Sequence, residues 1–533
     1  MAVLKRQTEI ISFQKTVVAV FFLSFLTLGL SIHKDYGVHW DEYQNQYFGT
    51  RWLNYIHKTI SERHISSPKF IKYRKHDWVH GPAFEIFLSF IQKDILGITN
   101  PRKIIFARHL FTFLTFYLGV FFFYLLCKIH FRNWKTGLLG GLFLILSPRI
   151  FAHSFYNSVD IPFLSFYIIG IYALLKLLDK KTYLWVIFCA LVSAVLIDIR
   201  IIGVSLSIYV FVFLLIELSK DKKGLIKTIK ILLLYILFLI VFIVIFQPLL
   251  WENPLVKISE ILKHAKEVSW SWPVLYLGKY IRGNSTPWHY PLVWIAISTP
   301  LIYIFYFLIG FLFSMKSLVK PSENPLEKRN NLVFTLWVFL PLIFSMGFKI
   351  GLYDGRRHLF FIYPAFLIFS LEGFIFLFRY LKERLRGLNY RITNVVLLTV
   401  TMYGLLNVVY FMICYHPYQN TYFNALAGRD MKEVKSKFEL DYWGLSYKQA
   451  LEYIVRTDHS PSIKIFVSNL PGKDNTNILK APDRKRLIFV HNIKEAKYFA
   501  SNYRWHPNPF ELKHEYFSIK VRNAKIMVVY KLK

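Results

Sequence analysis

Residues 226–247 read IKTIKILLLYILFLIVFIVIFQ, an apolar run interrupted only by the charges of Lys227 and Lys230. A helix of about 20 residues crosses the hydrocarbon core of a bilayer and satisfies its own backbone hydrogen bonds there. Similar runs recur along a chain in which 55% of the residues are hydrophobic. The sequence therefore predicts an α-helical polytopic membrane protein with about eleven spans. We place them at 15–33, 106–127, 136–150, 160–178, 183–198, 202–219, 226–247, 289–312, 331–348, 358–378 and 393–414.

The charge of the chain is strongly positive, with 66 Lys and Arg against 32 Asp and Glu. These charges lie mostly between the apolar runs, where they contact lipid head groups and set the orientation. We therefore expect membrane lipids, and no nucleic acid, as partners. If the spans alternate, the short Lys-rich loops share one side with the N-terminus, and the positive-inside rule makes that side cytoplasmic. We expect a multi-pass protein of the cell (inner) membrane with an extracytoplasmic C-terminal tail.

The expected division has three parts. Residues 1–414 form the membrane domain, with a long external loop at 34–105. Residues 415–440 form a connector to a small extracytoplasmic α/β domain at 441–533. A helical stretch at 446–455 is followed in this tail by apolar runs of strand length at 463–468, 487–490, 498–500 and 526–530. The tail shows no catalytic set, so we expect a chain stopped near Thr457 still to bind its donor.

Two acidic positions follow expected spans on the outer side. Residues 39–43, HWDEY, place the adjacent carboxylates of Asp41 and Glu42 just outside the membrane surface. A carboxylate there can accept the proton of an attacking hydroxyl. The alternative is helix capping, with Asp41 starting a helix. Asp160, after the third span, has the same two interpretations, and in the functional one it shares an aqueous cavity with Asp41.

Basic side chains on the same side indicate an anion site. Arg108 lies at the outer start of the second span, where a guanidinium usually has a partner, and phosphate is a natural one because it is bound bidentately. Snorkelling to the interface is the alternative. A second cluster breaks the positive-inside trend in the loop before the tenth span. Its members are Lys349, Arg356, Arg357 and His358.

Aromatic motifs lie near the outer ends of other spans, at Trp251 and at Trp288, His289 and Tyr290. Interfacial belts contain such residues, but aromatic rings also stack on sugars, so these four are candidates for sugar or acceptor binding.

Metal ligands are a weaker possibility. His153, His264 and His289 could join Glu85 or Asp41, but no tight ligand spacing supports a site. We expect no required cofactor, and a divalent metal stays open.

The motifs together resemble the GT-C superfamily of membrane glycosyltransferases. They are most similar to the protein O-mannosyltransferases of family 39 and to bacterial polyprenyl-phosphate-sugar transferases of the lipid A aminoarabinose type. The resemblance covers about residues 1–445. The matching positions are Asp41-Glu42, His80-Gly81-Pro82, Arg108, 157–162, 248–251, 287–291, 416–428 and 441–444.

This resemblance implies an inverting glycosyltransferase that moves a hexosyl or pentosyl group from a polyprenyl-phosphate carrier to a hydroxyl on the external membrane face. The acceptor would be a lipid, a glycan or a protein. The resemblance gives Asp41 the role of base, while Glu42 would orient the acceptor and Asp160 would support the site. Arg108 and the cluster at 349–358 would hold the donor phosphate.

Two other functions fit a membrane protein with external charges, besides a non-catalytic scaffold. One is a transporter or flippase of lipid-linked sugars, although transporters usually place ionisable residues near the bilayer midplane and often carry inverted repeats. The other is a metal-dependent oligosaccharyltransferase.

Overall fold

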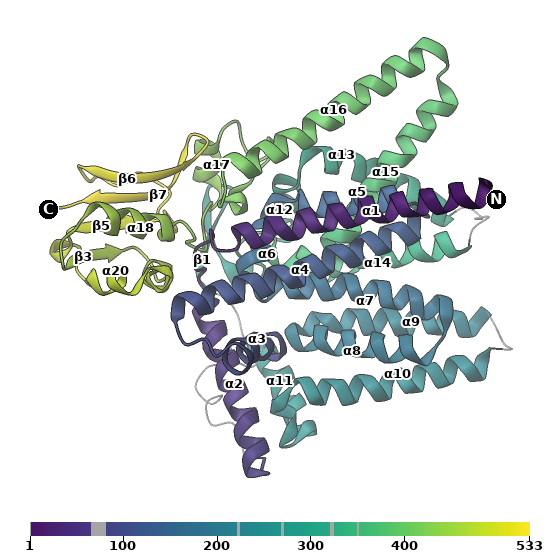
Figure 1. Cartoon of the computed structure of the whole chain (residues 1–533), viewed down its shortest axis with the longest axis horizontal. Helices are drawn as coiled ribbons and strands as arrows, with labels where there is room; N and C mark the ends of the chain where they lie inside the picture. The colour runs from purple at the N-terminus through teal and green to yellow at the C-terminus, as the bar shows by residue number, and fades with distance from the viewer. Residues whose placement is uncertain (1, 66–80, 221–223, 268–270, 320–324, 349–350) are drawn as a thin grey trace.

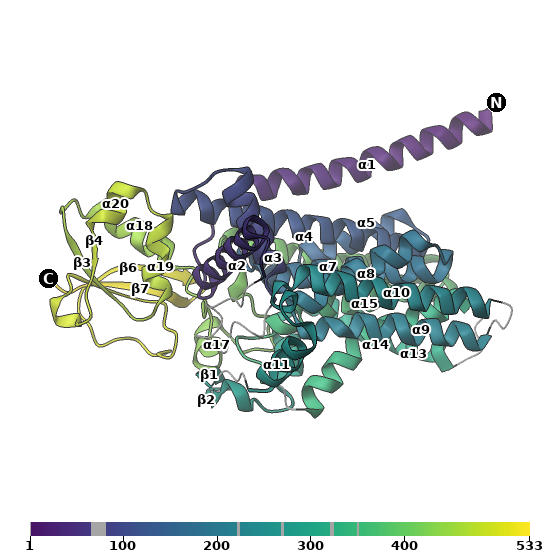
Figure 2. The same cartoon turned by 90° about the horizontal axis from the view of Figure 1, so that it is seen from below.

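The computed structural model describes residues 2–65, 81–220, 224–267, 271–319, 325–348 and 351–533. Long helices run side by side in one bundle, and a small sheet domain lies at one end of it (Figures 1 and 2). The N-terminus lies at the opposite end of the bundle. The chain is thus a polytopic helical membrane protein with a small C-terminal α/β domain, as the sequence predicts.

Nine helices of the described residues are long and apolar enough to cross a membrane, or ten if one bent pair counts as a span. The nine are α1 (Ala2–Ile32), α4 (Pro101–Phe131), α7 (Asp160–Lys180), α9 (Val204–Lys220), α10 (Leu225–Phe246), α13 (Leu301–Val319), α14 (Pro325–Gly347), α15 (Tyr363–Arg384) and α16 (Gly387–Cys414). The bent pair and the shorter apolar helix α8 (Tyr183–Ile199) correspond to the other two expected spans.

Two expected spans differ from straight helices, each at a proline. The third is divided into α5 (Trp134–Ile145) and α6 (Pro148–Tyr156), which are bent by 72°. The run at 289–312 is divided into α12 (Tyr290–Ser298) and α13, with Pro300 at the break. Proline lacks a backbone donor and keeps the preceding residue out of helical conformation, so it ends one helix and starts the next.

Close helix packing in the bundle depends on small residues. A side-chain carbon at Gly310 of α13 would collide with the backbone of α15, and one at Gly373 of α15 would collide with α13. The two helices therefore approach at their backbones, which is how glycine holds neighbouring membrane helices together.

The segments between the long helices form further elements at the bundle end next to the sheet domain. The long loop after α1 folds into α2 (Glu42–Glu62) and α3 (Ala83–Phe90). The loop after α10 holds α11 (Pro254–Glu267) and a hairpin of β1 (Pro273–Tyr276) and β2 (Lys279–Arg282) that the sequence did not predict. Short 3₁₀ and π segments are η3 (Ile91–Ile95), η4 (Ile201–Gly203), η5 (Pro248–Trp251), η6 (Gly283–Ser285), η7 (Arg357–Ile362), η8 (Gln419–Thr421), η9 (Asn475–Ile478) and η10 (Ile493–Glu495).

The C-terminal domain contains one five-stranded sheet in the order β4-β3-β5-β7-β6. The β3 strand pairs in parallel with β4 and β5, while β7 pairs antiparallel with β5 and β6. Four strands and α18 lie where the sequence predicts them, and β6 is additional. The elements are α17 (Met431–Lys437), α18 (Tyr447–Thr457), α19 (Pro471–Asp474), α20 (Ala481–Arg486), β3 (Ile463–Val467), β4 (Leu487–Phe489), β5 (Tyr498–Ser501), β6 (Glu515–Val521) and β7 (Ala524–Lys531).

Candidate active site

Segments that are far apart in the sequence converge where the bundle meets the sheet domain. They are the chain before α2, the start of α7, the loop before α15, and residues 438–446 and 502–505. The site is therefore built from both parts of the protein.

Asp41 precedes α2 and is only partly buried. Its backbone N–H donates to Nδ1 of His39 at 3.2 Å. Asp41 is the N-cap residue of α2, as the capping alternative expects, but its side chain makes no capping hydrogen bond. Within the described part of the chain, the Asp41 carboxylate accepts no hydrogen bond and forms no ion pair, which leaves its oxygens available to a ligand.

Glu42 lies beside Asp41 in sequence but points into the protein. It is 2% exposed, and its Oε1 lies 3.0 Å from Nε2 of His109 in α4. Its Oε2 accepts a hydrogen bond from the backbone N–H of His39 at 3.3 Å. Burial alone would raise the pKa of Glu42, but His109, His39 and Arg108 hold it below its ordinary value. Glu42 is thus a buried anion that ties the loop before α2 to α4.

Asp160 occupies the first position of α7 and is 2% exposed. Arg200 pairs with its Oδ1, and Nη1 of Arg357 lies 3.4 Å from its Oδ2. The side-chain amide of Asn157 also donates to Oδ2 at 2.8 Å. The structure therefore brings Asp160 and Arg357 together, but the Asp160 carboxylate is already occupied by protein partners.

Arg504 comes from the C-terminal domain, and the sequence did not single it out. Its Nη2 lies 2.9 Å from Oδ1 of Asp354, its Nη1 donates to the carbonyl of Tyr442, and its guanidinium lies 4.9 Å from the centre of the Trp40 ring. Burial would lower the pKa of Arg504, but the charges of Asp354, Glu439 and Asp41 raise it. Arg504 is thus a buried cation within electrostatic reach of Asp41.

An unusual backbone holds Arg504 in place. Both of its neighbours, Tyr503 and Trp505, have positive φ values of 62° and 63°. Residues with side chains adopt this conformation rarely, and it often marks functional positions. The only sequence signal was the aromatic pair flanking an arginine, which does not specify a partner.

Aromatic side chains line the inner wall of the site. The ring of His39 stacks on Trp443 at 4.5 Å, and Nε1 of Trp443 donates to Oδ2 of Asp354 at 3.3 Å. Burial lowers the pKa of His39 to about 4, so its ring is neutral near pH 7 and accepts from Asp41 through Nδ1. His153 lies behind Trp443, with Nε2 3.3 Å from the hydroxyl of Tyr442.

The predicted phosphate ligands occupy different places. Arg108 is buried and pairs with Glu85, which also accepts from Ser158 at 2.5 Å. Arg356 is buried and donates to Oγ1 of Thr299 at 2.6 Å. His358 packs against Tyr353, and Lys349 lies outside the described residues.

A further buried cation, Arg149 of α6, lies near this group. Its Nε donates to the carbonyl of Tyr422 at 2.9 Å, and its guanidinium lies 4.4 Å from the centre of the Phe423 ring. Neither Arg149 nor Arg356 has a carboxylate partner among the residues that the structure describes. Two buried positive charges without a counter-ion favour an anionic ligand.

The predicted aromatic residues do not form one cluster. Trp251 donates from Nε1 to the carbonyl of Val244 and packs with Tyr55 of α2. Trp288 is exposed.

The two residues after Trp288 are held by protein partners. Nδ1 of His289 lies 2.7 Å from the Tyr276 hydroxyl. Tyr290 is buried, and its hydroxyl accepts from the backbone N–H of Gly355 at 3.2 Å. Tyr290 therefore positions the loop that carries Arg356 and Arg357.

The metal candidates are dispersed. Glu85 pairs with Arg108, His289 contacts Tyr276, and the side chain of His264 lies outside the described residues. No three His, Cys, Asp or Glu side chains gather as ligands within the described ranges.

Residues 85–250 match the family described as "Dolichyl-phosphate-mannose-protein mannosyltransferase". This segment contains Arg108, Arg149 and Asp160 and spans less than half of the chain. No curated protein sequence matches the chain significantly.

Two solved structures of ArnT from Cupriavidus metallidurans are similar to the chain. The one described as bound to undecaprenyl phosphate is 13% identical, with a TM-score of 0.46 and coverage of 96% of this chain and 98% of that one. The apo structure is 12% identical, with a TM-score of 0.46 and coverage of 98% of both chains.

The chain thus resembles the GT-C superfamily of membrane glycosyltransferases, as the sequence predicts. Within that class, its matched segment is similar to the protein mannosyltransferases.

Proposed function

We propose that this protein is an inverting glycosyltransferase that moves a sugar from a polyprenyl-phosphate carrier to an acceptor hydroxyl. The observation that carries the proposal is the accessible carboxylate of Asp41, which has no described protein partner and lies within electrostatic reach of Arg357 and Arg504. A base beside cations is the arrangement that transfer from a phosphate leaving group needs. The family match supports a lipid-phosphate donor, because that family is described by dolichyl-phosphate-mannose.

In the proposed reaction, the acceptor oxygen attacks the anomeric carbon of the donor sugar while Asp41 takes the proton of that hydroxyl. The new bond joins the acceptor oxygen to the anomeric carbon. The bond from that carbon to the phosphate oxygen breaks, and its electron pair stays on the phosphate. One displacement inverts the anomeric configuration. The energy comes from the donor's phosphate bond, so the reaction uses no nucleotide sugar.

The buried cations of the candidate site have the role of stabilising the departing phosphate. Arg357 and Arg356 carry this role in the proposal, and Arg149 joins them because it has no described counter-ion. Preorganised donors of this kind stabilise charge that develops in the transition state. Lys349, His358 and Arg108 remain proposed phosphate ligands, although Arg108 would have to share its guanidinium with Glu85.

The remaining predicted site residues have less direct roles. Asp160 positions Arg357, and Glu42 fixes the loop that carries Asp41. Orientation of the acceptor by Glu42 stays a proposal, and it would act through the loop because the carboxylate is buried. Trp251, Trp288, His289 and Tyr290 remain candidates for sugar or acceptor contacts.

The orientation follows from loop charge. We propose that the bundle end carrying the sheet domain faces away from the cytoplasm and that the N-terminus is cytoplasmic. Reporter fusions at Lys222 and at Lys533 should then give opposite signals. Equal signals would contradict this orientation.

The proposed function is tested by reconstitution. The purified protein in nanodiscs should release free polyprenyl phosphate from a polyprenyl-phosphate sugar when membrane lipids and glycans are supplied as acceptors, and mass spectrometry should find the inverted product. Transport of intact donor without cleavage would overturn the proposal in favour of a flippase. A complete loss of activity on chelation, restored by a divalent metal, would favour a metal-dependent enzyme.

A further inference from the structure

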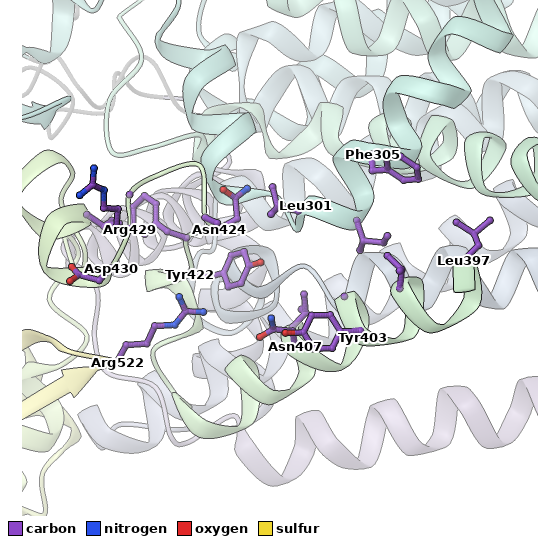
Figure 3. A pocket seen from close by; sticks show the side chains of 18 of the residues that line it. Leu301, Phe305, Leu397, Tyr403, Asn407, Tyr422, Asn424, Arg429, Asp430 and Arg522 are labelled. Atoms are coloured by element: carbon purple, nitrogen blue, oxygen red, sulfur yellow. The ribbon is translucent and has the colours of Figure 1, made fainter. Parts of the chain in front are cut away.

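A groove of about 730 Å³ lies between α13, α15 and α16, and its lining does not include Asp41 (Figure 3). Its walls are largely apolar and include Leu301 and Phe305 of α13 and Val396 and Tyr403 of α16. The α16 helix diverges from the bundle in Figure 1, and Tyr403 is 71% exposed. The groove therefore opens toward the lipid phase along most of a membrane-spanning helix.

The mouth of the groove is formed by residues 422–434 and by Arg522 of the C-terminal domain. Arg522 lies in the turn between β6 and β7, with a φ of 52°, and its guanidinium lies 5.6 Å from the centre of the Phe411 ring. The adjacent Asn523 accepts a hydrogen bond from the backbone N–H of Met431 at 3.1 Å, which fastens the turn to the start of α17. Figure 3 shows Arg522 extending toward Tyr422 at the groove's end. A cation is thus placed at the end of an apolar channel.

The other charges at the mouth leave this cation available. Asp430 also lines the groove, but its side chain accepts from the backbone N–H of Glu433 at 2.9 Å and so caps α17. Arg429 adds a second positive charge to the lining. The mouth is therefore complementary to an anion, and a guanidinium binds phosphate oxygens in a bidentate manner.

We propose that this groove binds an anionic phospholipid of the surrounding bilayer, with its acyl chains between α13 and α16 and its phosphate at Arg522. The occupant needs an apolar part to cover the walls and a negative head group at the level of the sheet domain. A bilayer phospholipid supplies both, and it reaches the groove by lateral diffusion. The cavity volume lies within the range of about 300–1,000 Å³ that is typical of ligand-binding pockets.

The wall of the groove connects it to the candidate active site. Tyr422, Phe423 and Asn424 line the groove. The same segment holds Arg149 on its other side, through the Tyr422 carbonyl at 2.9 Å and the Phe423 ring at 4.4 Å. A lipid in the groove therefore stabilises the segment that positions a buried cation of the site.

Fixed backbone contacts keep this wall from collapsing into the groove. The side-chain amide of Asn424 donates to the carbonyls of Ala296 and Thr299, each at 2.6 Å. These bonds tie the segment to the end of α12, so the groove is a feature of the packed bundle and not of a loose loop.

The test is native mass spectrometry of the full-length protein after delipidation and titration with phosphatidylglycerol or phosphatidylcholine. Wild type should retain phosphatidylglycerol about tenfold better, because a charge-assisted pair discriminates by that order. Arg522→Ala should remove this preference and Arg522→Lys should keep part of it. Lys520→Ala is the matched control, since Lys520 lies on β6 and is exposed outside the groove lining.

A second pair of variants tests the groove itself. Val396→Trp fills the groove and should abolish phosphatidylglycerol retention, while Val395→Trp, on a neighbouring exposed position that does not line it, should not. Thermal melting of both variants establishes that they fold. Equal retention of the two phospholipids, or equal behaviour of the two tryptophan variants, would overturn the proposal. So would polyprenyl phosphate displacing phosphatidylglycerol at equal concentration, because the carrier would then be the occupant.

Discussion

Arg504 of the C-terminal domain pairs at 2.9 Å with Asp354 in the loop before α15, 150 residues away in the sequence. Both side chains are buried, at 5% and 4% exposed. The pair joins the sheet domain to the loop that carries Arg356 and Arg357. Because one of its side chains lies in the candidate site, we propose that the tail contributes to that site, in contrast to the expectation from sequence.

The first prediction concerns this pair. Arg504→Ala should lower the free energy of unfolding by about 1.5–3 kcal/mol, because Asp354 loses one charged hydrogen-bond partner but keeps Arg357 at 3.8 Å and the Trp443 indole. It should also reduce sugar transfer, and a chain stopped near Thr457 should lose donor binding. Thermal unfolding and transfer assays measure both effects, with Lys531→Ala, on the exposed end of β7, as control. Wild-type activity in a correctly inserted truncation would restore the accessory interpretation.

Replacement of Asp160 by asparagine should change the stability of the protein more than the same replacement of Asp41. Asp160→Asn removes the charge that Arg200 and Arg357 share in a buried place, so we expect about 3–5 kcal/mol of destabilisation. Asp41→Asn should leave the unfolding midpoint unchanged, since its carboxylate has no described protein partner. Parallel melting curves in one detergent make the comparison. Similar stability of the two variants would contradict the assigned roles.

The Arg108–Glu85 pair is suited to a double-mutant cycle. Arg108→Leu and Glu85→Leu should each destabilise the protein, and the double variant should be less destabilised than the sum, because no buried charge is then left alone. Donor titration of Arg108→Lys tests phosphate binding separately, because lysine keeps the charge and loses the planar fork. Additive effects would show that the two side chains do not depend on each other.

The lowered pKa of His39 predicts how the stability of the protein changes with pH. Its pKa falls from 6.5 to about 4 on burial, so the unfolded chain takes up a proton at higher pH than the folded one. The stabilisation is therefore complete above about pH 6.5 and is lost as the pH falls toward 4, by about 3 kcal/mol in total. His39→Asn keeps an acceptor for the Asp41 N–H and cannot titrate. Its stability should fall less than that of wild type between pH 7 and pH 5, and an equal fall would exclude His39 as the cause.

The sequence was sufficient to predict a helical membrane protein, because so many apolar runs of span length are stable only in a bilayer. It also singles out Asp41 as a candidate base, since an acidic pair directly after a span is close to the membrane surface wherever the loop goes, and that role stays a prediction. The helix breaks at Pro148 and Pro300 follow from proline chemistry, but the 72° bend at the first depends on the packing of neighbouring helices.

Most pairings in the site could not be predicted from sequence. Arg108 required a partner, but only the packing of α3 against α4 makes that partner Glu85. The position of Arg504 depends on how the sheet domain meets the bundle and on a left-handed backbone at Tyr503 and Trp505. The β6 strand was missed because Ser518 and Lys520 interrupt its apolar residues, so that they form no continuous apolar run.

The central claim is that Asp41 is the base. The most direct measurement is the initial rate of transfer by Asp41→Asn in nanodiscs with a polyprenyl-phosphate sugar, together with donor binding and the melting temperature. Asparagine keeps the shape and removes the base, so turnover should fall roughly 10²- to 10⁴-fold while donor binding and stability are retained. Glu42→Gln should reduce turnover less and lower stability, because Glu42 is buried against His109. Normal turnover by Asp41→Asn would contradict the account.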